Sequence, residues 1–335
     1  MTRTTHRHLR SAVITTVAAS LVLAVAACGD DANAAAGGGD PKQVTIAYQP
    51  GLSYAPLLLL KQDRTLEKKF PDTTFKWKEL SSSSAVQDGM ISGDIQVGAG
   101  SAAQMILAWD KGVAWKYLSS LNDAQLWLMA KDPKLTSLKD FTHADQIAMP
   151  SPTSVQALVL RKAAQDQLGK ASALDTNIVA MAHPDGVQNL ISGQVAGHLT
   201  SPPFEFQEKE QGAHTVLKST DVFGKTMFNG VFLMDDFYQQ NTAFAEGLSD
   251  ALEGAIDELK DDPAKAAKSL SENAGGKTSP AEFEKYLTNP AITFTTEPHG
   301  LEKIAAFMKD IKMISKTPES WKDLTFPTLQ SAHGN

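Results

Sequence analysis

The chain has 335 residues, with 31 Lys and Arg against 38 Asp and Glu, and a single cysteine. This acidic balance argues against a nucleic-acid-binding protein and against electrostatic docking on anionic lipid. Because one cysteine has no internal partner, we expect a fold without disulfides.

Residues 1–27 are predicted to be a lipoprotein signal peptide. A basic stretch precedes an uncharged apolar run, Ala12–Ala27, which is short for a membrane span and ends in small residues. Val25–Cys28 resembles the lipobox of bacterial lipoproteins, in which the cysteine is acylated; an ordinary secreted protein with a spare thiol is the alternative. Two acyl chains give stable anchoring, so we expect an extracytoplasmic protein held at the membrane by Cys28.

Cleavage at this point removes three arginines and no acidic residue, leaving 28 basic against 38 acidic residues and a net charge of −10. Residues 28–43 are rich in Ala, Gly and Asp and show no apolar periodicity, which predicts a flexible tether. The folded part is expected to begin near Val44.

From Val44 onward, strand patterns alternate with helix patterns. Gln49-Pro50-Gly51 is a turn signal after the first strand, and Ser53 with Pro56 is typical of a helix start. This order indicates an α/β domain with a largely parallel sheet. The expected elements are strands at Val44–Tyr48, Phe75–Leu80 and Ile95–Val97, with helices at Leu57–Leu60 and Ala85–Ser92.

The same order of elements then recurs. Ile91–Ile95 and Ile191–Val195 lie one hundred residues apart, each after a predicted helix and before a short strand and a loop of small residues. Ile147–Pro150 and Ile178–Met181 match the first and second strands of the repeat. The repetition predicts two similar α/β lobes.

Two apolar extended stretches, Trp127–Ala130 and Val231–Met234, are predicted to be the paired crossovers between the lobes. Apolar residues at helix spacing within 244–259 and 301–311 predict C-terminal helices that pack back on the first lobe. The expected division is lobe I at 44–128 and 234–330, and lobe II at 129–233.

A set of short motifs stands in a specific order along the chain: Ile46–Gln49 with Ala55–Leu57, Met90–Ile95, Ile147–Ser151, Leu190–Val195, and Phe307–Met308 with Glu319–Leu324. Together these motifs resemble the nitrate, sulfonate and taurine family of ABC-transporter substrate-binding proteins, over about residues 44–327. The resemblance implies a type II periplasmic-binding-protein fold, in which two lobes joined by two crossovers close on a ligand by hinge motion.

Ligands of open α/β sheets bind at loops beyond the carboxyl ends of the strands, where helix N-termini and hydroxyls suit an anion or a polar oxygen. The alternative for the serines and threonines is helix capping, which does not exclude binding. The candidate ligand-binding residues are Gln49, Ser53, Tyr54, Ser81, Ser82, Ser83, Gly100, Ser101, Ser151, Thr153, Ser154, His183, Thr200, Ser201 and Phe204. For His183 and His198 an ordinary hydrogen-bonding role is the alternative to ligand contact.

Arg64 and Arg161 are the only arginines after Cys28, and both are expected within helices on outer faces, so an arginine clamp is not expected. Anion recognition would then depend on amides and hydroxyls.

The favoured function is solute capture for an ABC importer by a monomer that needs no metal or cofactor and delivers its ligand to the permease. The first choice of solute is sulfonate-like or another small anion; a neutral heterocycle such as a pyrimidine thiamin precursor is the second. An exported enzyme or a sensory lipoprotein on the same fold remains the rival class, although the sequence contains no Gly-x-Ser-x-Gly, phosphate-loop, dinucleotide or His-Glu-x-x-His motif.

Overall fold

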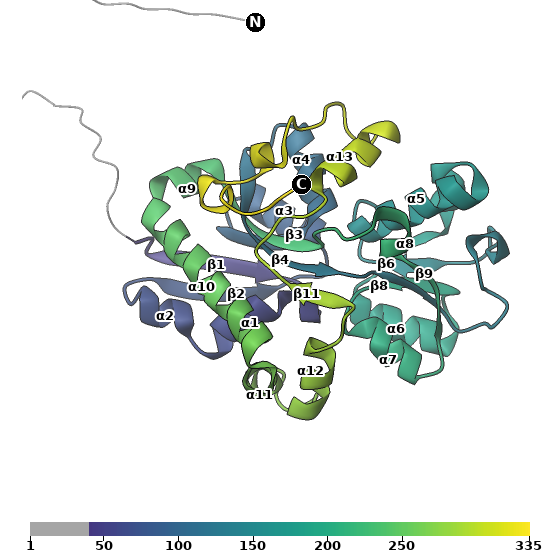
Figure 1. The fold of residues 1–335 in the computed structure, drawn as a ribbon, viewed down its shortest axis with the longest axis horizontal. Coiled ribbons are helices and arrows are strands. Elements are labelled where there is room, and N and C mark those ends of the chain that lie inside the picture. The colour runs from purple at the N-terminus through teal and green to yellow at the C-terminus, as the bar shows by residue number, and fades with distance from the viewer. Residues whose placement is uncertain (1–39) are drawn as a thin grey trace, which may run out of the picture. The chain divides into compact units, whose positions relative to one another are not determined.

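The computed structural model describes residues 40–335 as a mixed α/β structure with two sheets (Figure 1). The expected signal peptide, the lipobox and most of the expected tether lie outside these residues. The strand order is β11-β4-β10-β3-β1-β2 in the first sheet and β7-β6-β8-β5-β9 in the second. We call the half built on the first sheet lobe I and the half built on the second sheet lobe II. The expected α/β fold class is confirmed.

The strands have the following bounds. Lobe I contains β1 (Gln43–Tyr48), β2 (Thr74–Glu79), β3 (Val97–Ser101), β4 (Trp115–Ala124), β10 (Asn229–Met234) and β11 (Ile292–Phe294). Lobe II contains β5 (Trp127–Ala130), β6 (Ile147–Met149), β7 (Ile178–Ala180), β8 (Gly197–Thr200) and β9 (His214–Lys218).

The two sheets share one arrangement. In lobe I, β1 runs parallel to β2 and β3, and β10 is antiparallel to β3 and β4. In lobe II, β6 runs parallel to β7 and β8, and β5 is antiparallel to β8 and β9. The equivalent strands β3 and β8 begin at residues 97 and 197. The repetition expected from the hundred-residue spacing is therefore present.

The connections between the sheets differ from those expected. Trp127–Ala130 is β5, a full strand of lobe II, and Val231–Met234 belongs to β10, a strand of lobe I. Each strand is hydrogen-bonded on both sides within its own sheet, so neither is itself a crossover. The chain crosses at residues 125–126 and returns through the short helix α8 (Ser219–Phe223) and residues 224–228. The expected lobe II segment, 129–233, therefore includes part of a lobe I strand.

Several helix boundaries follow from the local sequence. The hydroxyls of Ser82 and Ser154 accept the N–H groups of Ala85 and Ala157 at the starts of α3 and α5. The helices are α1 (Ala55–Gln62), α2 (Thr65–Lys69), α3 (Ser83–Ile91), α4 (Ala102–Asp110), α5 (Val155–Leu168), α6 (His183–Ser192), α7 (Phe204–Glu210), α8 (Ser219–Phe223), α9 (Asp235–Gln240), α10 (Thr242–Asp261), α11 (Pro263–Asn273), α12 (Pro280–Leu287) and α13 (Leu301–Asp310). Short 3-10 helices lie at Leu52–Tyr54, Leu138–Asp140, Ala171–Asn177, Trp321–Leu324 and Pro327–Leu329.

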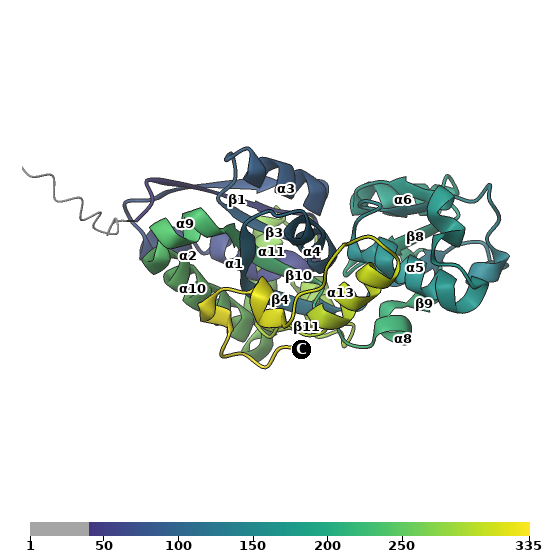
Figure 2. The same cartoon turned by 90° about the horizontal axis from the view of Figure 1, so that it is seen from above.

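The C-terminal helices pack on lobe I, as expected. α10 and α11 lie against α1, and α13 lies against α4. Figure 2 shows α9 and α10 along lobe I, while α13 lies nearer to lobe II, which is drawn in teal. The apolar stripe of α10 is buried from Phe244 to Leu259, and the helix ends where Asp262 caps the next helix at Pro263.

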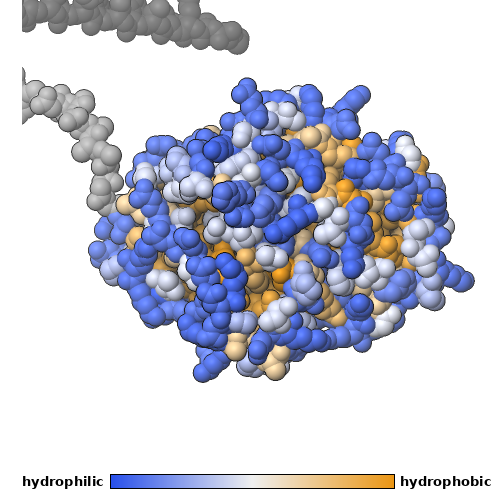
Figure 3. All heavy atoms as spheres, viewed as in Figure 1, coloured by the Kyte–Doolittle hydropathy of each residue, from blue (hydrophilic) through white to orange (hydrophobic). Residues whose placement is uncertain are grey.

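The surface is largely hydrophilic on the face drawn in Figure 3, with small apolar areas between polar side chains. Ile91 is a large apolar side chain that is 55% exposed. Within residues 40–335, no helix combines the length and the apolar character that a membrane span requires.

Candidate functional site

A small cavity lies between the lobes, where the loops at the carboxyl ends of their strands meet. Its volume is about 20 Å³, which leaves room for roughly one water molecule. This end of a parallel sheet is the usual ligand position in α/β folds. Lobe I lines this cleft cavity with Gln49, Pro50, Tyr54, Ser83, Ser101, Phe228 and Asn229, and lobe II with Pro150, Ser154, Gln156, His183 and Ser201.

Much of the lining consists of equivalent positions from the two halves. Because both halves have the same order of elements, equivalent loops meet face to face across the cavity. The pairs, each separated by one hundred residues, are Pro50 and Pro150, Tyr54 and Ser154, Ser83 and His183, and Ser101 and Ser201.

Gln49 organises the lobe I wall. Its Nε2 donates to Tyr54 Oη at 2.6 Å and to Ser83 Oγ at 3.0 Å, and the N–H of Ser101 also donates to Ser83 Oγ, at 2.9 Å. A Cβ at Gly100 would lie 2.9 Å from Ser83 Oγ, so glycine is needed for this close packing. Burial raises the pKa of Tyr54 far above its usual range, so its phenol stays neutral.

Two polar side chains of this wall have no partner in the described part of the protein. Ser101 Oγ and both the oxygen and the nitrogen of the Asn229 amide make no hydrogen bond there, although the residues are only 3% and 0% exposed. Buried polar groups are nearly always paired, because an unpaired group has lost its hydration without replacement. Both residues line the cavity, which makes these atoms candidates for hydrogen bonds to a polar solute.

Helix N-termini surround the same cavity. α3 begins at Ser83 and α6 at His183, while Ser101 and Ser154 are the N-cap residues of α4 and α5. Helix N-termini carry partial positive charge and unpaired N–H groups. No Asp, Glu, Lys or Arg is among the described residues that line the cavity, so these N-termini dominate its electrostatics.

His183 is the ionisable group of the lobe II wall. Its Nε2 lies 3.2 Å from the Gln156 amide, and its Nδ1 lies 3.0 Å from His198 Nε2 and 3.2 Å from Thr200 Oγ1. The Phe204 ring lies against the imidazole, with the ring centres 5.3 Å apart. Burial and the neighbouring His198 lower the pKa of His183 well below its usual range.

Behind His183 lies a fully buried histidine–carboxyl pair. His198 Nδ1 is 2.5 Å from Glu208 Oε1, and both side chains are 0% exposed. Burial raises the pKa of Glu208 to about 9 and lowers that of His198 to about 3, because each charged form loses its hydration. Burial also raises the pKa of Glu205, one helical turn away, and Glu208 adds to that effect. Burial thus disfavours the charged form of each partner.

The lobes touch each other around the cavity, so this is a closed cleft. The N–H of Leu52 donates to the Pro202 carbonyl at 3.0 Å, and Thr153 Oγ1 donates to Gln104 Oε1 at 2.6 Å. Further out, Lys285 of α12 pairs with Glu210 of α7 at 2.6 Å.

Residues 37–271, more than half of the chain, match the NMT1-like family. The chain belongs to the NMT1-like family. No match is found among curated proteins.

Solved structures share the fold of this NMT1-like protein. The alkanesulfonate-binding protein SsuA from Xanthomonas axonopodis pv. citri, bound to MOPS, has a TM-score of 0.70 and 21% identity, covering 83% of this chain and 96% of its own. The periplasmic aliphatic sulphonate binding protein SsuA from Escherichia coli has a TM-score of 0.65 and 18% identity, covering 86% and 92%. The periplasmic nitrate-binding protein NrtA from Synechocystis PCC 6803 has a TM-score of 0.59 and 13% identity, covering 72% and 68%. The expected resemblance to sulfonate- and nitrate-binding proteins is confirmed at the level of the fold.

The candidate residues of this NMT1-like chain fall into three groups. Ser53, Gly100, Ser151, Thr200 and Phe204 are buried but do not line the cavity, and Thr153 is partly buried in the lobe contact. Ser81 is exposed, and Ser82 caps α3, so neither lines the cavity. The residues that line the cavity are Gln49, Tyr54, Ser83, Ser101, Ser154, His183 and Ser201.

Five residues of the lining were not predicted from the sequence, namely Pro50, Pro150, Gln156, Phe228 and Asn229. Pro50 and Pro150 follow equivalent strands, and the hundred-residue spacing that identified the repeat would have found the pair. Asn229 opens β10 after the return connection, which was expected at Val231–Met234. Gln156 lies in the first turn of α5, next to the predicted Ser154.

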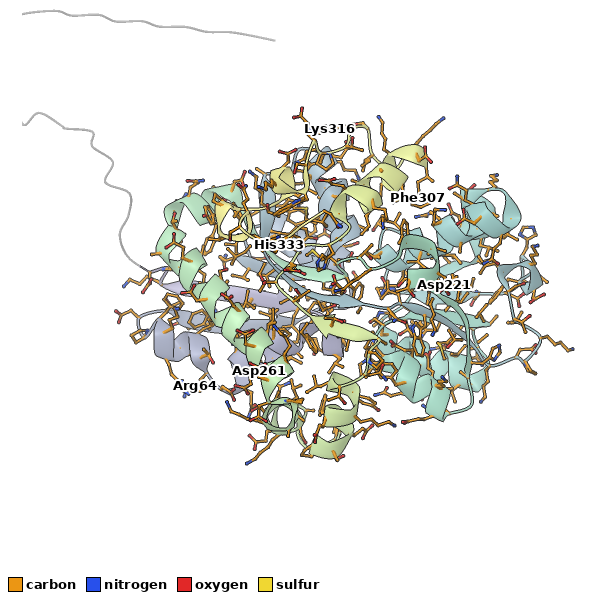
Figure 4. All side chains as sticks on the ribbon, in the orientation of Figure 1. Arg64, Asp221, Asp261, Phe307, Lys316 and His333 are labelled. Atoms are coloured by element: carbon orange, nitrogen blue, oxygen red, sulfur yellow. The ribbon has the colours of Figure 1, made fainter. Side chains whose placement is uncertain are left out.

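The arginines lie away from the cavity, although not as predicted in detail. Arg64 is exposed at the outer edge of lobe I (Figure 4) but lies between α1 and α2, in a left-handed conformation with φ 52°. Arg161 is half-buried rather than outward-facing, because it pairs with Asp175 at 2.8 Å and reaches Met313 of lobe I. Within residues 40–335, no group of three or more His, Cys, Asp or Glu side chains is arranged to hold a metal ion.

Proposed function

We propose that this chain is the extracytoplasmic solute-binding protein of an ABC importer, and that it captures a small organic anion, sulfonate-like in its polar head, between its lobes. The carrying observation is that two buried polar groups, Ser101 Oγ and the Asn229 amide, have no partner among residues 40–335 and belong to residues that line a cavity surrounded by helix N-termini. Such N-termini favour anions, and hydroxyl and amide donors suit the oxygens of a sulfonate. The names of the SsuA and NrtA structures support the same class of solute.

The closed cleft supports binding by hinge motion. A cavity of about 20 Å³ is too small for an organic sulfonate, so the lobes stand further apart than in this structure both when the solute enters and when they have closed on it. The solute stabilises the closed form only by as much as it prefers that form over the open one. Closure then presents one composite surface of both lobes to the permease, and the receptor acts as a monomer.

A neutral heterocycle is the second candidate for the solute. The cavity lining includes the amides of Gln49, Gln156 and Asn229, and each amide offers a donor and an acceptor of the kind that pairs with the edge of a pyrimidine. Tyr54 and Phe228 add aromatic surface against which a flat ring can pack.

A receptor is favoured over an enzyme by the surroundings of His183. Its hydroxyl partner, Thr200, is 0% exposed, so that hydroxyl is not open to attack a solute. The other partners of the imidazole are Gln156, whose amide is not a nucleophile, and His198, which is 0% exposed and therefore not open to a solute.

We also propose that Cys28 anchors the protein to the outer face of the cell membrane through its lipid. The support is the lipobox-like Val25–Cys28 after an apolar run. A Cys28→Ala chain is expected in the medium or the periplasm. Its persistence in the membrane fraction would contradict the anchor.

The solute is tested by calorimetry and thermal unfolding with MOPS, alkanesulfonates, nitrate, carboxylates and pyrimidines, because a bound solute raises the melting temperature by mass action. We expect sulfonates to bind. The double variant Ser101→Ala/Asn229→Ala should fold normally. It should bind the best sulfonate about tenfold or more weakly, since each substitution removes a hydrogen bond to the solute.

Ser120→Ala is the matched control, because Ser120 Oγ is also buried without a partner in the described structure but does not line the cavity. The Ser120→Ala variant should bind the sulfonate as tightly as the natural chain does. Binding of pyrimidines alone would select the second candidate, and unchanged affinity in the double variant would reject this site.

A further inference from the structure

A buried hydrogen-bonded chain leads from Glu208 to the cleft cavity. Glu208 Oε1 lies 2.5 Å from His198 Nδ1, and His198 Nε2 lies 3.0 Å from Nδ1 of His183, which lines the cavity. Glu208 and His198 are 0% exposed, so the solute touches neither. This row of hydrogen bonds has one end at the cavity and the other in the interior of lobe II.

The positions of the ring hydrogens of His198 and His183 depend on one proton, the one shared between Glu208 and His198. If the Glu208–His198 pair holds a proton between Oε1 and Nδ1, the other hydrogen of His198 is on Nε2 and is donated to Nδ1 of His183. The hydrogen of His183 is then on Nε2, whichever atom of the Glu208–His198 pair holds the shared proton. If the pair loses that proton, every bond reverses, and His183 Nε2 becomes an acceptor.

The surroundings favour the form that holds the proton. A buried carboxylate needs a compensating cation, and no lysine or arginine in the described structure lies within ion-pair distance of Glu208, whose partner is His198. Lys209 of the same helix and Lys218 of β9 lie over the Trp127 ring instead, with Nζ 5.6 Å and 5.0 Å from its centre. Glu205 is on the same helix, and both its oxygens lack a partner among the described residues; Tyr54 is across the cavity, and Asp185 of α6 is exposed. Burial raises the pKa of Glu208 to about 9, which is consistent with a retained proton at neutral pH.

We infer that Glu208, acting through His198, holds His183 in the tautomer with its hydrogen on Nε2, so that His183 donates a hydrogen bond to an acceptor oxygen of the solute. This inference rests on the proposed function and narrows the solute to one that presents an oxygen acceptor to His183, as a sulfonate or carboxylate does. Glu208 is thus a positioning residue for recognition.

Gln156 does not decide the tautomer. Its amide lies 3.2 Å from His183 Nε2 and can present either its oxygen or its NH₂ group by turning over. It therefore follows the state of His183. Glu208, in contrast, cannot change its role by turning over. Its carboxyl donates when it is protonated and accepts when it is ionised, so the protonation state of Glu208 sets the direction of the hydrogen bonds.

The tautomer is tested without any solute, by long-range ¹H–¹⁵N NMR of the histidine rings in the purified chain. His183→Gln identifies the His183 signals. We expect hydrogen on Nε2 of both His183 and His198 at neutral pH, with a change to Nδ1 above about pH 9 as Glu208 ionises. In Glu208→Gln, whose NH₂ donates to His198 Nδ1 as the carboxyl does, the Nε2–H form should persist. Hydrogen on Nδ1 of His183 at neutral pH would overturn the inference.

Binding gives the second test, with MOPS and methanesulfonate as probes. In the natural chain the dissociation constant should rise by up to about tenfold per pH unit above about pH 9, while in Glu208→Gln it should stay flat. Glu253→Gln, an exposed glutamate of α10, is the control and should follow the natural chain. The same loss of affinity in Glu208→Gln would overturn the role of Glu208.

The two tests separate this inference from the proposed function. If the Nε2–H form is found but neither probe binds, the proposed solute is contradicted, and the control that Glu208 exerts on His183 stands. If the probes bind but His183 carries its hydrogen on Nδ1, the receptor stands and this inference fails.

Discussion

The backbone N–H of Leu52 in lobe I donates a hydrogen bond of 3.0 Å to the carbonyl oxygen of Pro202 in lobe II. The preceding residue, Gly51, has φ 137°, a conformation that side chains disfavour. A Cβ there would lie 3.5 Å from both the Pro202 oxygen and the Phe204 ring. At this point of the rim the lobes thus meet through a backbone hydrogen bond.

Gly51→Ala should weaken solute binding by roughly tenfold, because the left-handed strain of about 1–3 kcal/mol shifts the turn that holds Leu52 against Pro202. Calorimetry with the best-binding sulfonate measures the change. Gly254→Ala is the control, since Gly254 lies within α10 with nothing within 4 Å of its Cβ position. It should leave affinity unchanged and stabilise the fold slightly. Equal affinities in both variants would show that the rim contact does not favour closure.

The Lys285–Glu210 ion pair also joins the lobes, but its side chains are 66% and 51% exposed. Exposed pairs contribute little because water and salt screen them. Lys285→Met should therefore change solute affinity by less than about threefold, and the difference should vanish in high salt. A tenfold loss that persists in high salt would show that this pair controls closure.

The fold was predictable where sequence patterns are local and repeated. The one-hundred-residue spacing of Ile91–Ile95 and Ile191–Val195 identified the repeat, and the strand-end rule found seven residues of the cavity lining. Serines such as Ser154 were visible as helix caps, and the structure has Ser154 both capping α5 and lining the cavity.

Features that depend on tertiary packing were not predictable. The segment Phe204–Glu210 contains three glutamates and looks like a solvated helix, yet Glu205 and Glu208 are 0% exposed. Their burial depends on how α7 packs on α6, which no local pattern encodes. Asn229 reached the cavity through a sheet pairing between distant parts of the chain, and apolarity alone did not reveal that β10 belongs to lobe I.

Gly186→Ala should destabilise lobe II by about 1–3 kcal/mol, because overpacking a rigid core costs that much. A Cβ at Gly186 would lie 2.4 Å from His198 Nε2, and the His198 ring is held by Glu208 on its other side. Urea unfolding measures the loss, with Gly254→Ala as the control. A stability equal to that of the natural chain would mean that the His198 ring is free to move aside.

The buried Glu208 carboxyl should make stability depend on pH. Its pKa rises from the ordinary 4.5 to about 9 in the folded protein, so the folded state keeps a proton that the unfolded state has lost between these values. The contribution of this proton to the free energy of unfolding is fully present below about pH 4.5 and is lost as the pH rises toward 9. The pKa of His198 is lowered from 6.5, so this histidine makes stability rise with pH, but only below pH 6.5. The effect of Glu208 on stability is therefore measured above that pH.

Glu208→Gln cannot titrate, so it should gain stability relative to the natural chain by at most about 1.4 kcal/mol per pH unit above about pH 6.5. Urea unfolding of both proteins at about pH 6.5 and about pH 8.5 measures the difference. Glu253→Gln, whose carboxyl is exposed, should show no such gain. A parallel pH dependence in Glu208→Gln and the natural chain would mean that Glu208 is already ionised in the fold, because only a retained proton couples its burial to pH.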